Sequence, residues 1–129
     1  MEPKLNFIHV SENAFFSQEG KLSIIGIFDK IFSDNFPALH PAFAISLGMI
    51  GESGFHKIQI DVVSPQGQSI IPKIEKTIEI AQGGGGANFV ANLVGLVFTE
   101  SGKYVIKIAI DDKPADKNGY LTLEKSPHA

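Results

Sequence analysis

The chain has 129 residues, of which 43% are hydrophobic and 19% charged, and its formal net charge is −3. That composition is too apolar for a disordered protein, and no apolar run approaches the roughly 18 residues that a membrane-spanning helix needs. Lysines are scattered singly and arginine is absent, which argues against the clustered cationic surfaces that bind nucleic acids or acidic membranes. Cysteine is absent as well and no secretory signal is visible, so we expect a cytoplasmic protein that binds neither nucleic acid nor membrane.

A period of two recurs along the sequence, whereas helical periodicity is almost absent. In chain order, the segments expected to form strands are 5–10, 22–32, 42–50, 55–63, 73–80, 89–98, 104–110 and 120–124. Segment 55–63 alternates most clearly, with polar residues at 57, 59 and 61, as in a strand with one wet face. Short strands with turns about every ten residues predict a β-sandwich or barrel, in one domain over residues 1–129.

Proline and glycine set the expected loops. Pro37 and Pro41 each lack a backbone donor for a sheet ladder, so residues 36–41 are expected to form a crossing loop. Residues 83–86 are four consecutive glycines and are expected to form a flexible connection. A phosphate-binding loop would need a helix to follow, and the sequence after the glycines is strand-like instead.

Residues 100–106 carry a pattern that favours the sandwich. Glu100 is followed by Gly102 and Tyr104, with an inward position at Ile106. This is similar to the tyrosine corner of immunoglobulin-like domains, in which the tyrosine hydroxyl bonds to nearby backbone. The alternative is a tight turn followed by an ordinary strand tyrosine. Tryptophan and cysteine are absent, so the disulfide-centred core of antibody domains does not fit.

Segment 20–29, with the sequence GKLSIIGIFD, resembles the most characteristic stretch of a family of small uncharacterised bacterial proteins. Residues 36–37, 64–67 and 102–104 lie where that family has similar elements. The resemblance implies an all-β fold, an immunoglobulin-like antiparallel β-sandwich of about seven to nine strands, usually as a stand-alone domain. It implies no assigned activity and supplies no catalytic residues.

Motifs for catalysis or metal binding are not found in the sequence. No nucleophile elbow and no closely spaced pair of histidines occurs, so we predict that the chain is not an enzyme and needs no metal or other cofactor. Side chains with metal-ligating chemistry are His40, His56, Asp112, Asp116 and Asn118. The last three lie in segment 111–119, which has the oxygen ligands that calcium prefers but lacks a closing acidic residue. Because Asn-Gly is a strong hairpin signal, we predict a turn at residues 118–119.

Apolar side chains exceed what a sandwich interior needs in segment 89–98 and at Phe15 and Phe16. Segment 89–98 is apolar on both faces, and we assign residues 90, 94, 96 and 98 to one face. One of the two faces then has no partner inside the sandwich, unless a long loop or a second subunit covers it. A homodimer with two-fold symmetry is the hypothesis we favour. The expected interaction residues are Val90, Val94, Leu96, Phe98, Phe15 and Phe16.

The sequence therefore predicts a non-enzymatic binding or assembly module, which contacts a protein partner of unknown identity or associates with itself. One alternative is a metal-dependent ligand binder or small enzyme that uses His40, His56 and the acidic loops. Another is a module that binds a peptide as an added strand at a sheet edge.

Overall fold

The computed structural model describes residues 2–83 and 85–127, and within them it contains strands and turns only. None of the described segments is a helix that could span a membrane. The strands are β1 (Lys4–Phe16), β2 (Leu22–Ile27), β3 (Lys30–Ser33), β4 (Ala38–Gly51), β5 (Gly54–Val63), β6 (Ile74–Ile80), β7 (Gly85–Phe98), β8 (Gly102–Ile110), β9 (Lys113–Pro114) and β10 (Gly119–Lys125).

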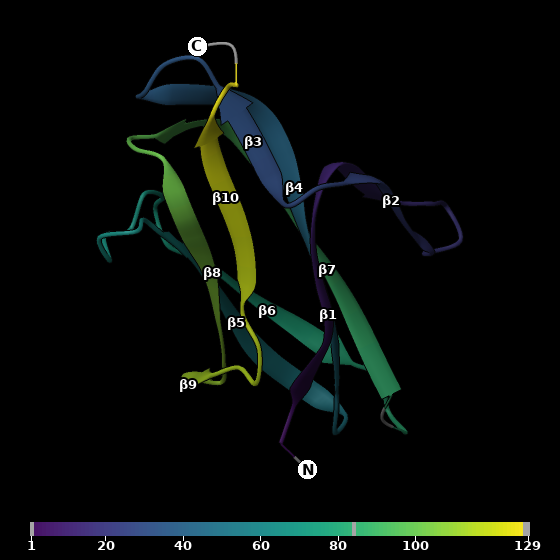
Figure 1. Ribbon diagram of the computed structural model, residues 1–129. Helices are drawn as coiled ribbons and strands as arrows, with labels where there is room; N and C mark the ends of the chain where they lie inside the picture. The colour runs from purple at the N-terminus through teal and green to yellow at the C-terminus, as the bar shows by residue number, and fades with distance from the viewer. Residues whose placement is uncertain (1, 84, 128–129) are drawn as a thin grey trace.

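The strands form two sheets that pack face to face (Figure 1). Sheet A has the order β2-β1-β4-β7, and sheet B has the order β3-β10-β8-β5-β6, with the short β9 paired to β8. All strand pairs are antiparallel except β3 and β10, which run parallel. The immunoglobulin-like β-sandwich expected from the sequence is confirmed, with this one parallel pair as an addition.

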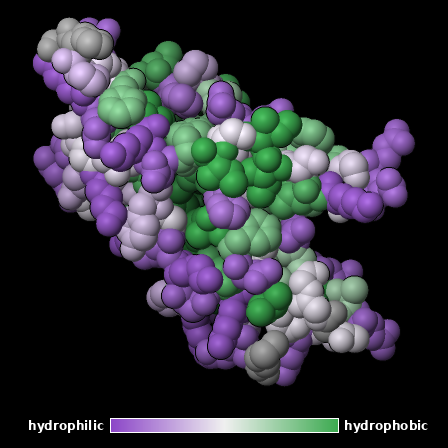
Figure 2. All heavy atoms as spheres, turned by 45° about the vertical axis from the view of Figure 1, so that its right-hand side comes forward, coloured by the Kyte–Doolittle hydropathy of each residue, from purple (hydrophilic) through white to green (hydrophobic). Residues whose placement is uncertain are grey.

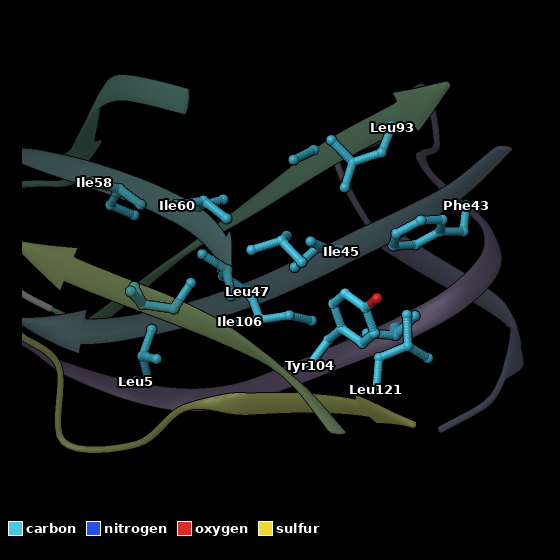
Figure 3. Packing of buried hydrophobic residues seen from close by; sticks show 14 of the residues in the cluster. Leu5, Phe43, Ile45, Leu47, Ile58, Ile60, Leu93, Tyr104, Ile106 and Leu121 are labelled. Atoms are coloured by element: carbon cyan, nitrogen blue, oxygen red, sulfur yellow. The ribbon is translucent and has the colours of Figure 1, made fainter. Parts of the chain in front are cut away.

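The interior is built by alternation from both sheets (Figure 3). Ile45 and Leu47 of β4 project into it from sheet A, and Ile58 and Ile60 of β5 project into it from sheet B; all four are at most 1% exposed. Successive side chains of a strand point to opposite faces, so the polar residues between Ile58, Ile60 and Val62 lie outside, as the sequence predicts.

The tyrosine corner is confirmed. Tyr104 is fully buried, its hydroxyl donates to the carbonyl oxygen of Glu100 at 2.7 Å, and the Glu100 backbone N–H donates to that hydroxyl at 3.2 Å. Its ring meets the edge of Phe98 at 5.1 Å between centroids. These contacts fix the chain where it enters β8, next to the centre of the core.

The single strand expected over residues 22–32 is wrong, because the chain changes sheets inside it. Gly26 has a φ of 72°, which favours glycine, and β2 ends one residue later, at Ile27. Phe28 then donates its N–H to Val10 in sheet A, and Asp29 accepts the N–H of Thr122 in sheet B. The crossing between sheets therefore takes place at Phe28 and Asp29.

The crossing loop expected over residues 36–41 is also wrong in part, because β4 already begins at Ala38. Pro41 lies inside the strand, at a point where neither it nor the opposing Gly95 takes part in the ladder with β7. On its other side, β4 pairs with β1 only from Ala44 onward. A missing N–H at Pro41 therefore leaves no ladder partner unsatisfied.

Of the glycine run, residue 84 lies outside the described residues, and β7 begins at Gly85.

Candidate functional site

The outer face of sheet A is unusual because its central strand presents small residues. Phe43, Ile45, Leu47 and Met49 of β4 point into the core, so the residues that alternate with them point outward. These outward residues are Ala42, Ala44, Ser46 and Gly48. Larger side chains border this row on both sides, since His9 of β1 and Val90 of β7 are both paired with Ser46.

Phe7 shows how closely the outer face is packed. Its ring lies over Gly48, where a Cβ atom would be only 2.1 Å from ring atom Cε2. The ring also stacks with His9, at 5.5 Å between centroids. Ser46 is fully buried, and its hydroxyl has no hydrogen-bond partner among the described residues. This part of the outer face thus has the packing of an interior.

The other end of this face is exposed and apolar. Cross-strand pairs place Val94 beside Ala42, Val97 beside Leu39, and Ile27 beside Ser11. Val94 is 80% exposed and Ile27 60% exposed. Figure 2 shows hydrophobic residues gathered in the middle of this side of the molecule, between two projections with polar tips. We call this surface the apolar face and define it by its large exposed residues, Ile25, Ile27, Leu39, Val94 and Val97.

Only part of the predicted interaction set lies on this surface. Val94 is on the apolar face and Val90 is half-buried beside it, but Leu96 and Phe98 are core residues that are 7% and 0% exposed. The assignment of all four to one side of the strand is therefore wrong. Gly95 has a φ of 67°, and it shifts the alternation by one residue, so that the residues after it point to the opposite side.

Phe15 and Phe16 end β1, next to the turn that leads to β2, and they are 45% and 46% exposed. The β1–β2 hairpin projects from the body of the sandwich (Figure 1). Ile25 and Ile27 of the same hairpin were not among the predicted interaction residues. The positive φ of Gly26 between them could have been suspected from the sequence, because a glycine inside an apolar strand often marks such a break.

The candidate metal ligands lie apart from one another. Among residues 2–83 and 85–127, no group of three His, Asp or Glu side chains could hold a metal ion. Asp112 pairs with the ammonium group of Lys57, and Asp116 accepts the backbone N–H of Leu5 at 2.9 Å. Asn118 lines a shallow pocket of about 350 Å³ on the outside of sheet B. Asp112 and Asp116 therefore make separate contacts and do not converge on one point.

His40 lies near the start of β4, and His56 lies near the start of β5. His40 is the third residue of β4. Its ring lies near Phe28 and Phe43, with ring centroids 6.0 and 5.6 Å away. It borders an open pocket of about 560 Å³ together with Glu12 and Lys30. His56 follows the hairpin at the other end of β4. No joint site of the two histidines is therefore formed.

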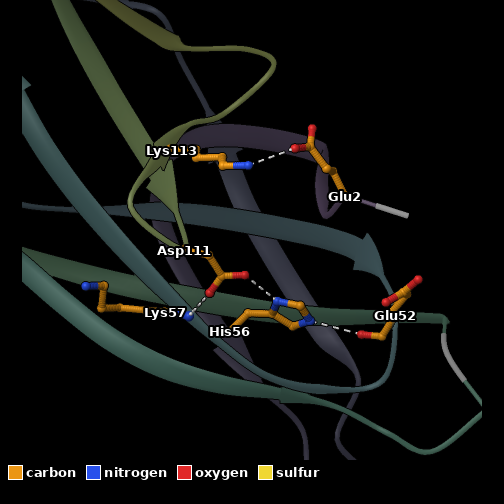
Figure 4. A network of polar contacts seen from close by, with 6 residues as sticks. All are labelled: Glu2, Glu52, His56, Lys57, Asp111 and Lys113. Atoms are coloured by element: carbon orange, nitrogen blue, oxygen red, sulfur yellow. Dashed lines mark hydrogen bonds and ion pairs between the residues drawn. The ribbon is translucent and has the colours of Figure 1, made fainter.

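His56 clamps two turns together (Figure 4). Its Nδ1 donates to Asp111 Oδ2 at 2.7 Å, and its Nε2 donates to the carbonyl oxygen of Glu52 at 2.9 Å. Asp111 also accepts the backbone N–H of Lys57 at 2.9 Å. Both ring nitrogens face acceptors, which only the protonated imidazolium satisfies at once. The ring is therefore fully engaged in structure and offers no free nitrogen to act as a base.

The electrostatics of this clamp follow from the same contacts. The hydrogen bond with Asp111, followed by that with Glu52, raises the pKa of His56 above its ordinary value. The hydrogen bond with His56 lowers the pKa of Asp111 in turn. His56 therefore stays protonated to a higher pH, and Asp111 stays deprotonated to a lower pH, than either group would alone.

The tight hairpin turn of this region lies at Asp111 and Asp112 rather than at residues 118–119, where it was expected. Asp111 and Asp112 both have positive φ, 51° and 67°, and they connect β8 to β9 through the pair Ile110 and Lys113. Two central residues with positive φ form a type I′ hairpin turn, which aspartate tolerates better than most residues. Gly119 instead begins β10.

Two solved structures with a similar fold belong to much larger proteins. The alkylpurine DNA glycosylase AlkC of Pseudomonas fluorescens, bound to DNA with an abasic site analog, matches with a TM-score of 0.57, 10% identity, and coverage of 95% of this chain and 30% of that one. A β-glucosidase of Listeria innocua in complex with isofagomine matches with a TM-score of 0.53, 8% identity, and coverage of 95% and 16%. This chain thus spans less than a third of either protein, and identities this low show the fold alone.

An immunoglobulin-like protein of Pseudomonas aeruginosa has 15% identity, a TM-score of 0.39, and coverage of 95% of this chain and 97% of that one. A comparison with curated proteins found no match. A family model, however, matches residues 6–118, which is most of the chain. This chain therefore belongs to the family of unknown function DUF6941.

Proposed function

We propose that this chain is a non-enzymatic binding or assembly module and that the apolar face is its contact surface. The observation that carries the proposal is the group of large side chains Ile25, Ile27, Leu39, Val94 and Val97, each 44–80% exposed, on one side of sheet A. Exposed apolar residues scattered singly are normal, whereas a contiguous apolar surface with polar surroundings is typical of protein contacts.

Two further features support binding over catalysis. The best-oriented histidine, His56, has both ring nitrogens engaged. The outer face near Ser46 and Gly48 is as tightly packed as a core, so the apolar face beside it is held in one shape before a partner arrives. A preorganised surface loses little conformational entropy on association.

Sedimentation velocity over a range of concentrations tests the self-associating form of the proposal. We expect a reversible dimer, and we expect Val94→Lys to weaken it by about tenfold or more, because Val94 is 80% exposed on the apolar face and a lysine buried there would lack a partner. Phe55→Lys is the matched control, since Phe55 is 72% exposed but lies on sheet B. A chain that stays monomeric at high micromolar concentration, or an equal effect of both variants, would contradict the proposal.

A further inference from the structure

Four strands form the edges of the two sheets, and they differ in how they are protected. The edges are β2 and β7 in sheet A, and β3 and β6 in sheet B. An edge strand presents unpaired N–H and C=O groups, which can template pairing with another chain. Soluble proteins usually prevent this with charged residues, prolines, bulges or very short edge strands.

Three of the four edges carry such protection. β6 has charged residues at 75, 76 and 79, and β3 has only four residues and begins with Lys30. β2 has six residues, and the positive φ of Gly26 interrupts it. These strands are poor templates because a partner strand would meet charge, a kink or too few hydrogen bonds.

β7 is different. It is 14 residues long, from Gly85 to Phe98, and contains no charged residue and no proline. It pairs with β4 along one side, from Ala38 to Gly51, and ends sheet A on the other. Gly95, at a φ of 67°, divides it, so the regular stretch that precedes Gly95 is the one able to accept a further strand.

Open space lies beside this edge. A groove of about 490 Å³ runs along residues 92–97, and its opposite wall is the segment 70–74. That wall presents Ile70, Ile71 and Ile74, together with the charged Lys73. An added strand that follows β7 could enter the groove with its end and place aliphatic side chains against both walls.

We infer that β7 pairs antiparallel with β7 of a second copy of this chain, across a two-fold axis, and joins two sheets A into one continuous sheet. The charge pattern favours a second copy as the occupant. A two-fold axis places a strand of one copy beside the equivalent strand of the other copy, so a strand that carries charged residues would meet like charges. β7 has none, and its aliphatic residues suit self-pairing.

This inference rests on the proposed function and specifies its geometry. Val90 lies on the outer side of β7, beside the apolar face. With the two-fold axis at residue 92, Val90 of one copy would pair with Val94 of the other, so the β7 side of the apolar face would lie at the contact, whereas Ile25 and Ile27 on the opposite edge strand β2 would stay outside it.

A single-cysteine scan of residues 88–94 tests the pairing, and the natural chain has no cysteine to interfere. Disulfides form only when the two Cα atoms are within about 7 Å. In an antiparallel pair, identical residues two positions away from the axis are about 14 Å apart along the strand. We therefore expect one position to cross-link rapidly and positions two residues away to cross-link at least about tenfold more slowly.

Asn13→Cys is the control, because Asn13 is an exposed residue of β1, an inner strand of the same sheet. Cross-linking through Asn13 with none in β7 would show packing face to face; it would overturn the strand pairing and leave the proposed function standing. A monomer without cross-links would overturn both.

Amide hydrogen exchange of the unmodified chain provides a second measurement that needs no substitution. We expect the amides of β7 before Gly95 to become at least about tenfold better protected when the dimer forms, because backbone groups that face solvent would enter a ladder. Dimerisation with unchanged protection in β7 would overturn the inference.

Discussion

The two sheets contribute alike to the interior but have opposite exteriors. On the inside, Ile45 of sheet A and Ile60 of sheet B are equally buried. On the outside, sheet B presents polar residues such as Gln59, Asp61 and Lys107 along a shallow pocket, and exposed aromatic residues such as Phe55 on its surface. Sheet A presents small or aliphatic residues along β4 and the apolar face. The shared interior determines the fold, while the difference between the exteriors points to the surface on which a partner would be recognised.

The largest effect on stability is expected from substitutions in the interior that the two sheets share. Ile45→Ala and Ile60→Ala each remove a fully buried side chain and leave a cavity. We expect each to lower the free energy of unfolding by about 2–5 kcal/mol, as measured by urea denaturation. A loss below about 1 kcal/mol for one of them would mean that the two sheets do not share one core equally.

The outer faces should respond differently to small changes. Gly48→Ala places a Cβ atom within the space of the Phe7 ring, and we expect it to destabilise the chain by about 1–3 kcal/mol. Lys107→Ala, on the outside of sheet B, should change stability by less than about 0.5 kcal/mol. Phe7→Ala provides the double-mutant test, since Gly48→Ala should cost clearly less in that background. Equal costs in both backgrounds would contradict the contact.

Loss of the contact between His56 and Asp111 should lower stability by a smaller amount, and that amount should depend on pH. Because the pKa of His56 is raised in the folded chain, its stabilisation is fully present below the unfolded value of about 6.5 and is lost as pH rises through the folded value. Asp111 has a lowered pKa, so its contribution is lost only in acid. We expect His56→Gln to reduce the urea midpoint more at pH 5.5 than at pH 8.5. An Asp111→Asn background should remove most of this pH dependence, and a larger loss at pH 8.5 would contradict the assignment.

The smallest effect is expected from metal ions at the acidic turn of sheet B. Asp112 and Asp116 already bind Lys57 and the Leu5 N–H, so the midpoint of thermal unfolding should stay the same with EDTA, Ca²⁺ or Zn²⁺. Stabilisation by several degrees with either ion, lost in His56→Ala or Asp116→Ala, would instead favour a metal-dependent role.

Much of the fold could be predicted from the sequence because strands such as β5, β8 and β10 keep a period of two. Ile58, Ile60 and Val62 all lie inside, as their spacing indicates. The tyrosine corner was predictable as well, since Glu100 and Tyr104 interact locally, within a few residues.

The errors occur where one residue interrupts the period. Gly95 shifts the alternation in β7 and moves Leu96 and Phe98 from the predicted surface into the core. Pro41 suggested a loop, but a proline is tolerated within β4 where no neighbouring ladder needs its N–H. The clamp of His56 and Asp111 joins residues 55 positions apart, and such a pairing depends on a strand register that periodicity alone does not supply.

The parallel pairing of β3 with β10 ties the first crossing between sheets to the last strand. Lys30 to Ser33 pair with residues 122–125, and β10 is the only neighbour of β3 in the order of sheet B. A chain shortened to end before Gly119 would therefore lose two strands rather than one, because Ile31 and the rest of β3 would have no strand to pair with. Tags, truncations or permutations that displace the final strand should consequently disturb the molecule about ninety residues upstream.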